Sequence, residues 1–317
     1  MGRYALARLL QAGPILLGIT LVAFLVLSSM PGGPLAAYRG NPNVRGEDLQ
    51  RLERQLGLDR PVYVRYLIWL GNFLRGEWGY SIVTQQPVLR MIGERFLNSL
   101  SLMAAALALT LAVAIPVGVY SAVRQYSLFD YAATGLAFVG LSLPSFWLGL
   151  LLILLFAVEL RWLPAGGMFT IGAPFSLADR LRYLVLPAAT LVVVSAGFYA
   201  RYLRASVLDV QRQDFVRTAR AKGLVDRSVT YRHVLKNAAL PFVTVVALHL
   251  TELITGAVVV ETIFAWPGMG RLFWESALRI DYPVLMGIMT LTAVVVLAAN
   301  LLADLLYGFL DPRIRYE

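Results

Sequence analysis

The sequence contains no cysteine and few charged residues. Cysteine is absent from all 317 residues, which excludes disulfide bonds, a thiol nucleophile and cysteine-ligated zinc. Only 15% of the residues are charged and 58% are hydrophobic, whereas soluble domains have about 25% charged and about 45–50% apolar residues. A soluble fold of this size could not bury so much apolar surface. The composition therefore predicts an integral membrane protein.

A nucleotide-binding loop is also missing. No segment matches G-x-x-x-x-G-K-[ST], the loop that holds nucleotide phosphates. The two histidines, His233 and His249, lie at opposite ends of a half-span and do not form a ligand pair. We therefore expect no ATPase or other enzymatic activity, no cofactor and no metal site in this chain. Energy for any active process must come from a partner.

Long apolar runs dominate the rest of the chain. About 20 apolar residues cross the hydrocarbon layer as a helix, and backbone polar groups in lipid must be satisfied within the segment. Six stretches qualify, namely residues 9–30, 96–123, 131–158, 183–200, 237–260 and 282–303. The sequence predicts an all-α membrane protein with six transmembrane helices. Residues 1–95 would hold the first helix and an extracytoplasmic segment, and residues 96–317 a core of five helices.

Basic residues indicate the orientation. The formal net charge is +9, and the lysines and arginines lie between the apolar runs rather than in a polar domain. This pattern favours membrane topology and anionic lipid contact over nucleic acid binding. The densest basic stretch is residues 201–240, between the fourth and fifth spans. Because basic loops stay in the cytoplasm, both termini and this loop are predicted to be cytoplasmic.

Two polar regions carry further information. Residues 63–73, after the first span, are rich in aromatic residues and could lie at the membrane interface or pore mouth, or form a folded cap without a ligand role. The 201–240 loop reads as two short helices on either side of Gly223, a residue suited to positive φ. Small residues at Ala219 and Ala221 would allow close approach to a partner. This loop could dock in a groove on another protein, or only orient the chain by its charge.

Ionisable residues within spans are functional candidates because they are costly in lipid. His249 and Glu252 lie three residues apart on one helical face. They could line a polar path, or form hydrogen bonds with a partner helix. Glu261 lies at the outer boundary, where a pair with an arginine and contact with solute are both open. Candidate bends lie at Pro144, Pro187 and Gly197.

The 201–240 loop resembles the cytoplasmic motif of binding-protein-dependent ABC importer permeases. That motif has a Glu-Ala-Ala triplet, then a glycine and a later Leu-Pro. Here Ala219, Gly223 and residues 240–241 match, while Arg217 and Thr218 replace the Glu and first Ala. The form at residues 217–223 is similar to the dipeptide/oligopeptide/nickel subfamily. Further stretches resemble its first (B-type) permease, namely residues 8–10, 30–32, 56–61, 79–81, 141–146, 159–164, 260–271 and 311–316.

The resemblance implies a type I ABC importer permease fold and a heteromeric importer in a bacterial or archaeal cytoplasmic (inner) membrane. Its partners would be a second homologous permease, two cytoplasmic ABC ATPase subunits that bind ATP and Mg, and an extracytoplasmic solute-binding protein. The solute would be a peptide or a related small molecule. The ATPase-coupling residues would be Phe215, Arg217, Thr218, Ala219, Arg220, Ala221, Lys222, Gly223 and Leu224. The translocation path would include Ser142, Pro144, His249 and Glu252.

Two other classes of membrane protein fit the sequence less well. A secondary transporter driven by an ion gradient would show inverted repeats and paired broken helices. No convincing repeat is present in the sequence, and the 201–240 loop would have no role. An intramembrane protease needs a nucleophile and a base at membrane depth. His249 has Thr251 nearby, but no serine lies within a plausible motif.

Overall fold

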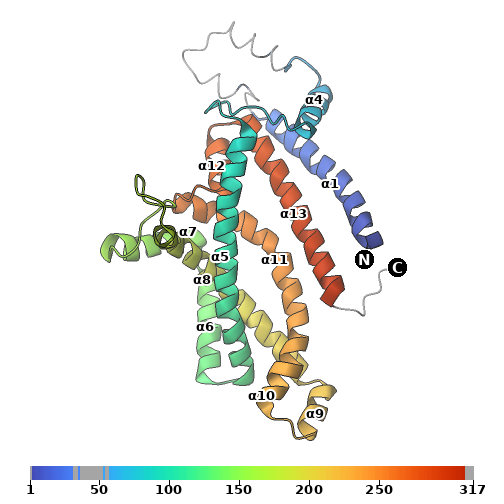
Figure 1. Ribbon diagram of the computed structural model, residues 1–317, viewed down its shortest axis with the longest axis vertical. Coiled ribbons are helices and arrows are strands. Elements are labelled where there is room, and N and C mark those ends of the chain that lie inside the picture. The colour runs from blue at the N-terminus through green and yellow to red at the C-terminus, as the bar shows by residue number, and fades with distance from the viewer. Residues whose placement is uncertain (1, 31–34, 36–52, 54–56, 311–317) are drawn as a thin grey trace. The chain divides into compact units, whose positions relative to one another are not determined.

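Helices make up most of the backbone that the computed structural model describes, namely residues 2–30, 35, 53 and 57–310 (Figure 1). Side chains of residues 2–7, 9, 248–257 and 303–310 are outside the described set. The prediction of an all-α protein is confirmed for the described residues. The helices, with the π-helical segments named η, are α1 Gly2–Ser28, α4 Val62–Leu74, α5 Val88–Val123, α6 Leu128–Ser142, α7 Ser145–Leu152, η2 Ile153–Glu159, α8 Leu177–Gln211, α9 Asp214–Ala221, α10 Asp226–Ser228, η3 Val229–Val234, α11 Leu235–Ile263, α12 Met269–Leu278 and α13 Tyr282–Leu310.

Four of these helices are long and apolar enough to cross a membrane within the described residues. They cover Leu10–Ser28, Val88–Val123, Leu177–Gln211 and Tyr282–Leu302, and the bent pair Leu128–Ser142 with Ser145–Glu159 adds a fifth if it is one span. The helix α11 coincides with the remaining predicted span, but the side chains of residues 248–257 lie outside the described set. The chain is thus a multi-span helical membrane protein, with four or five candidate spans among the residues that the structure describes.

The third predicted span is interrupted at Pro144, as expected. Leu143 is extended, with φ −82° and ψ 124°, because the ring of a following proline disfavours the helical conformation. The helices on either side are bent by 102°. Of the three predicted bends only this one divides a helix, since α8 continues through both Pro187 and Gly197.

One compact unit comprises residues 99–267 with the end of α13. Its core includes the fully buried side chains of Val207, Val216 and Val229, so α8 packs against the loop that follows it. Glycines allow its helices to approach closely. An added Cβ on Gly118 would lie 2.6 Å from the carbonyl oxygen of Ala200. Such small residues are typical of close helix packing in membranes.

The other compact unit comprises residues 2–98 and residues 268–298. Aromatic side chains hold α4 against α1: Phe24 contacts Tyr66 edge-on, with ring centroids 5.6 Å apart, and the Tyr66 hydroxyl lies 2.9 Å from Thr20 Oγ1. The inner face of the aromatic segment 63–73 is therefore packed within the chain. For that face, the structure thus favours the interpretation of residues 63–73 as a folded cap without a ligand role.

A buried carboxylate fixes the loop that follows α4. Asp281, 3% exposed, directly precedes α13. It accepts hydrogen bonds from the Ser81 hydroxyl at 2.5 Å and from the Ile82 N–H at 3.1 Å. Ser81 Oγ in turn accepts the Thr84 N–H at 2.9 Å. Because a buried charge is stable only when its oxygens are hydrogen-bonded, these contacts hold residues 81–84 against the start of α13.

Candidate functional site

Residues 215–237 form a compact helical element, the knob, which follows α8 and includes the first residues of α11 (Figure 1). The knob contains α9 from Phe215 onward, a turn at Gly223, then α10 and η3, which lead into α11. Two short helical runs on either side of a glycine were predicted from the sequence, and the structure confirms this arrangement. The second run is one α-helical turn followed by a π-helical turn rather than a regular helix.

The turn at Gly223 ends α9 in a defined way. Gly223 has φ +77°, as predicted. Its N–H donates to the carbonyl oxygen of Arg220 at 2.9 Å, and the Leu224 N–H donates to that of Ala219 at 3.4 Å. These two bonds form the Schellman pattern, which satisfies the last carbonyl groups of a helix and favours glycine at the left-handed position. The direction in which the chain leaves α9 is therefore fixed by the backbone.

One side of α9 is buried in the chain's own core. Val216 and Ala219, three residues apart, are 0% and 6% exposed and pack in the same cluster as Val229 and Val234. The expectation that Ala219 faces a partner needs correction, because its spacing from Val216 places it on the inner side of the helix. Ala221 is exposed and remains the small residue on the outer surface.

The outer surface of the knob combines apolar and basic side chains. Phe215 and Leu224 are 39% and 43% exposed, and Lys222 and Thr218 are also exposed. Sequence reasoning missed two apolar members, Val225 at 73% and Tyr231 at 59% exposure. The signal for both is an apolar or aromatic residue within a basic loop, and Val225 also lies two residues after the predicted turn at Gly223. An exposed surface of this kind is typical of a contact with another protein.

The arginines of the knob keep accessible side chains. Arg217 lies 3.6 Å from Asp214, and Arg220 lies 3.4 Å from Asp226. All four side chains are about half exposed or more, and exposed pairs of this kind contribute only about 0–1 kcal/mol. Both guanidinium groups can therefore exchange these partners for acidic groups on another subunit at little cost.

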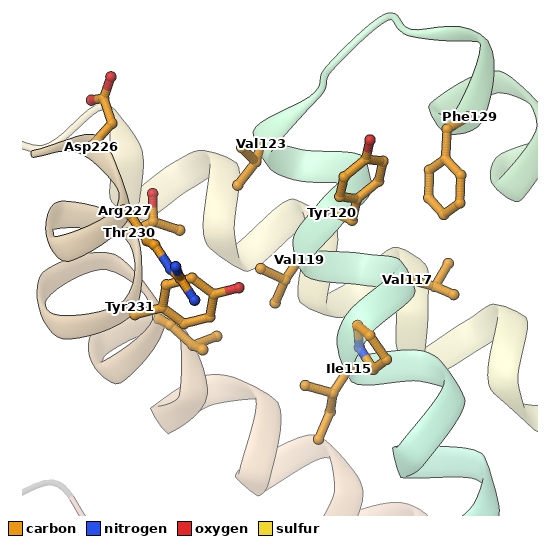
Figure 2. A pocket seen from close by; sticks show the side chains of 12 residues that line it. Ile115, Val117, Val119, Tyr120, Val123, Phe129, Asp226, Arg227, Thr230 and Tyr231 are labelled. Carbon is orange, nitrogen blue, oxygen red and sulfur yellow. The ribbon is translucent and has the colours of Figure 1, made fainter.

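A mostly apolar cavity of about 980 Å³ adjoins the knob. Figure 2 shows its α5 wall, with Ile115 and Val119, and the opposite wall, with Arg227 and Tyr231. The rings of Tyr120 and Phe129 pack edge-on with centroids 4.7 Å apart. Because one wall belongs to the knob, any displacement of the knob relative to α5 changes the width of this cavity.

The predicted translocation-path residues are not all placed by the structure. Ser142 and Pro144 are exposed and lie at the bend between α6 and α7. His249 and Glu252 belong to α11, but their side chains lie outside the described residues. Glu261, expected at an outer boundary, is fully buried, and the Ser99 hydroxyl donates to it at 2.5 Å. Burial favours a structural role for Glu261 over contact with solute.

Comparison with known proteins gives a consistent result along the whole chain. The family described as "Binding-protein-dependent transport system inner membrane component" matches residues 114–316, and its N-terminal companion family matches residues 1–103. The oligopeptide transport system permease protein AppB of Bacillus subtilis (strain 168) is 44% identical over all of both chains. The dipeptide transport system permease protein DppB of Escherichia coli (strain K12) is 37% identical, also over all of both chains.

Solved structures confirm the fold. The inward-facing MetNI methionine ABC transporter has a chain with TM-score 0.57 and 16% identity, covering 71% of this chain and 98% of that one. An amino acid ABC transporter crystallised with histidines gives TM-score 0.53 and 12% identity, covering 70% of this chain and 94% of the other. With the family matches above, the chain belongs to the inner membrane components of binding-protein-dependent transport systems, the permease subunits of ABC importers.

Proposed function

We propose that this permease forms one half of the translocation pathway of a peptide importer and is driven through its knob by ATPase subunits. Permeases of this family are multi-pass inner membrane proteins that act with a binding protein and with ATPase subunits, and they do not themselves hydrolyse ATP. The names of the relatives AppB and DppB, oligopeptide and dipeptide permeases, support peptides as the solute. The proposed assembly contains a second homologous permease and two ATPase subunits.

The proposed topology has six spans with both termini in the cytoplasm. The helix α11 is the sixth candidate, and its 29 residues would extend about 43 Å at 1.5 Å per residue, enough to cross the bilayer. An even number of spans places the basic 201–240 loop on the same side as the termini, in agreement with the rule for basic loops. We also propose that residues 1–95 are accessory to a core formed by residues 96–317.

The single observation that carries the proposed coupling role is the way the knob is attached. Its inner side, through Val216 and Ala219, is part of the core that also contains residues of α8 and α11. Its outer side presents Phe215, Leu224 and Val225. A force on the outer side is therefore transmitted to two long helices rather than absorbed by a loose loop. Coupling needs such an element, because nucleotide state can act only by favouring one of two arrangements of the spans.

Cysteine crosslinking tests the contact between the knob and the ATPase. The chain has no cysteine, so single cysteines can be introduced without background. In the assembled importer, Leu224→Cys should crosslink to an ATPase subunit carrying a cysteine in its groove, because Leu224 lies on the exposed surface of the knob. Ile171→Cys is the control, since Ile171 is 93% exposed but lies in the link before α8, predicted to be extracytoplasmic. Equal crosslinking of both variants, or none with Leu224→Cys, would contradict the proposed docking.

A further inference from the structure

A bidentate ion pair joins the start of α6 to α8. Arg204 Nε donates to Asp130 Oδ1 at 2.6 Å, and Arg204 Nη2 donates to Asp130 Oδ2 at 2.7 Å. The side chain of Asp130 is 3% exposed and that of Arg204 24% exposed. The Tyr126 N–H also donates to Asp130 Oδ2 at 2.9 Å. The carboxylate therefore ties the turn between α5 and α6 to one position on α8.

The same face of α8 contacts α6 along several turns. The Arg201 guanidinium lies over the ring of Phe138, 4.4 Å from its centroid. An added Cβ on Gly197 would lie 2.7 Å from Ala137 Cα, and one on Gly140 would lie 2.6 Å from the carbonyl oxygen of Val193. On α8 these contacts fall at residues 193, 197, 201 and 204, which lie on one face at helical spacing.

These contacts make α6 and α8 one body whose two ends lead to different parts of the transport machinery. At its C-terminal end α8 reaches Gln211, and α9 begins at Asp214. The helix α6 ends at Ser142, next to Pro144, where the chain bends by 102° between α6 and the helix that follows it. A displacement of the knob that carries α8 would also carry α6, and with it the bend, as long as the two helices stay in register.

The chemistry of the pair indicates positioning rather than simple stabilisation. Glycine contacts already allow α6 and α8 to pack closely, and moving two charges out of water opposes much of their mutual attraction. Buried ion pairs are therefore weak sources of stability, and their best-supported role is to select one arrangement among several. A bidentate arginine–carboxylate pair has a fixed planar geometry, which suits it to hold one register.

We propose that Asp130 and Arg204 are positioning residues for transport: the pair locks α6 to α8, so that movement of the knob reaches the bend at Pro144. This inference rests on the proposed coupling role of the knob. Neither residue touches solute or nucleotide in this scheme. Their loss should reduce the number of solute molecules imported per ATP hydrolysed, while leaving ATP hydrolysis and assembly of the importer in place.

The test uses the complete importer, with both permeases, the ATPase subunits and the binding protein, in proteoliposomes. Asp130→Asn and Arg204→Met should each lower uptake per ATP by about tenfold, within the range of typical coupling free energies. Arg204→Lys keeps the charge but loses the bidentate geometry, so its uptake per ATP should fall between these variants and the wild type. Glu94→Gln is the matched control, because the Arg90–Glu94 pair is exposed on both sides and its loss should leave the ratio unchanged.

Two results would overturn the proposal. One is an unchanged ratio of uptake to ATP hydrolysis in Asp130→Asn or Arg204→Met. The other is a loss of assembled importer in direct proportion to the loss of uptake in all three variants, Arg204→Lys included, which would make the pair only structural. If both neutral variants fail to assemble, Arg204→Lys decides, and a normal ratio in that variant counts against the proposal. A knob variant could lower uptake per ATP while the Asp130 and Arg204 variants keep a normal ratio of uptake to ATP hydrolysis. That result would remove this inference and leave the proposed function intact.

Discussion

Replacing Gly223 with valine is expected to separate ATP hydrolysis from solute uptake in the assembled importer. Gly223 has φ +77°, and a Cβ added there would meet no atom within 4 Å. The substitution is therefore strained by the backbone alone, by about 1–3 kcal/mol for a residue forced into this region, and a β-branched residue is the least suited to it. That strain would open the turn that ends α9 and release the outer surface of the knob from its fixed direction.

Two controls separate this effect from general damage. Gly223→Asn should retain most of the coupled uptake, because asparagine tolerates the left-handed conformation better than other residues with a side chain. Gly172→Val introduces the same strain elsewhere, since Gly172 has φ +81° and also has open space around its Cβ position. Uptake per ATP should fall about tenfold or more in Gly223→Val only, a size typical of lost coupling. A normal ratio in Gly223→Val would contradict the role of the knob.

The second large effect is expected from Gly140→Ala in α6. The new methyl group would lie 2.6 Å from the carbonyl oxygen of Val193 on α8, closer than any relaxed contact, so the helices must move apart. Overpacking of this kind typically destabilises by about 1–3 kcal/mol. The purified permease should therefore unfold at a lower temperature in detergent, and less assembled importer should be recovered.

Gly135→Ala is the matched control for this substitution. Gly135 lies in the same helix, and a Cβ there would meet nothing within 4 Å. Because alanine is a better helix former than glycine by up to about 1 kcal/mol, this variant should be as stable as the wild type or more so. Equal melting temperatures for Gly140→Ala and Gly135→Ala would show that α6 and α8 do not pack as described.

The sequence predicted the features that depend on local chemistry. Hydropathy located the long apolar helices, since about 20 apolar residues must follow one another to cross a membrane, but it did not predict the shorter helices α4 and α12. Pro144 interrupts its helix because proline restricts the residue before it. Gly223 adopts positive φ because glycine alone enters that region without strain. Each of these features is decided by a few neighbouring residues, so it can be predicted without knowledge of the packing.

Features that depend on long-range packing were not predicted. Which side of α9 faces inward depends on its contacts with α8 and α11, and the sequence therefore did not show that Ala219 is buried. Asp130 and Arg204 are 74 residues apart in the chain, and neither belongs to a motif that indicates the other. The register that brings them together follows from glycines such as Gly197 in the interface, which alone are poor indicators of a contact.

Membership of a binding-protein-dependent family sets aside the alternatives of an ion-gradient-driven transporter and an intramembrane protease. It agrees with the absence of a phosphate-binding loop from the sequence, because the ATPase activity resides in separate subunits of such systems. In the proposed scheme, the knob is the point where that energy enters the permease. Its fixed turn and buried inner side are the physical properties that this role requires.

Uptake of a labelled short peptide into proteoliposomes tests the central claim most directly. We expect uptake to require the second permease, the ATPase subunits with ATP on the side of the knob, and the binding protein on the opposite side. Collapse of the proton gradient should leave it unchanged. Uptake by the two permeases alone, driven by an imposed proton gradient without ATPase subunits, would contradict the account.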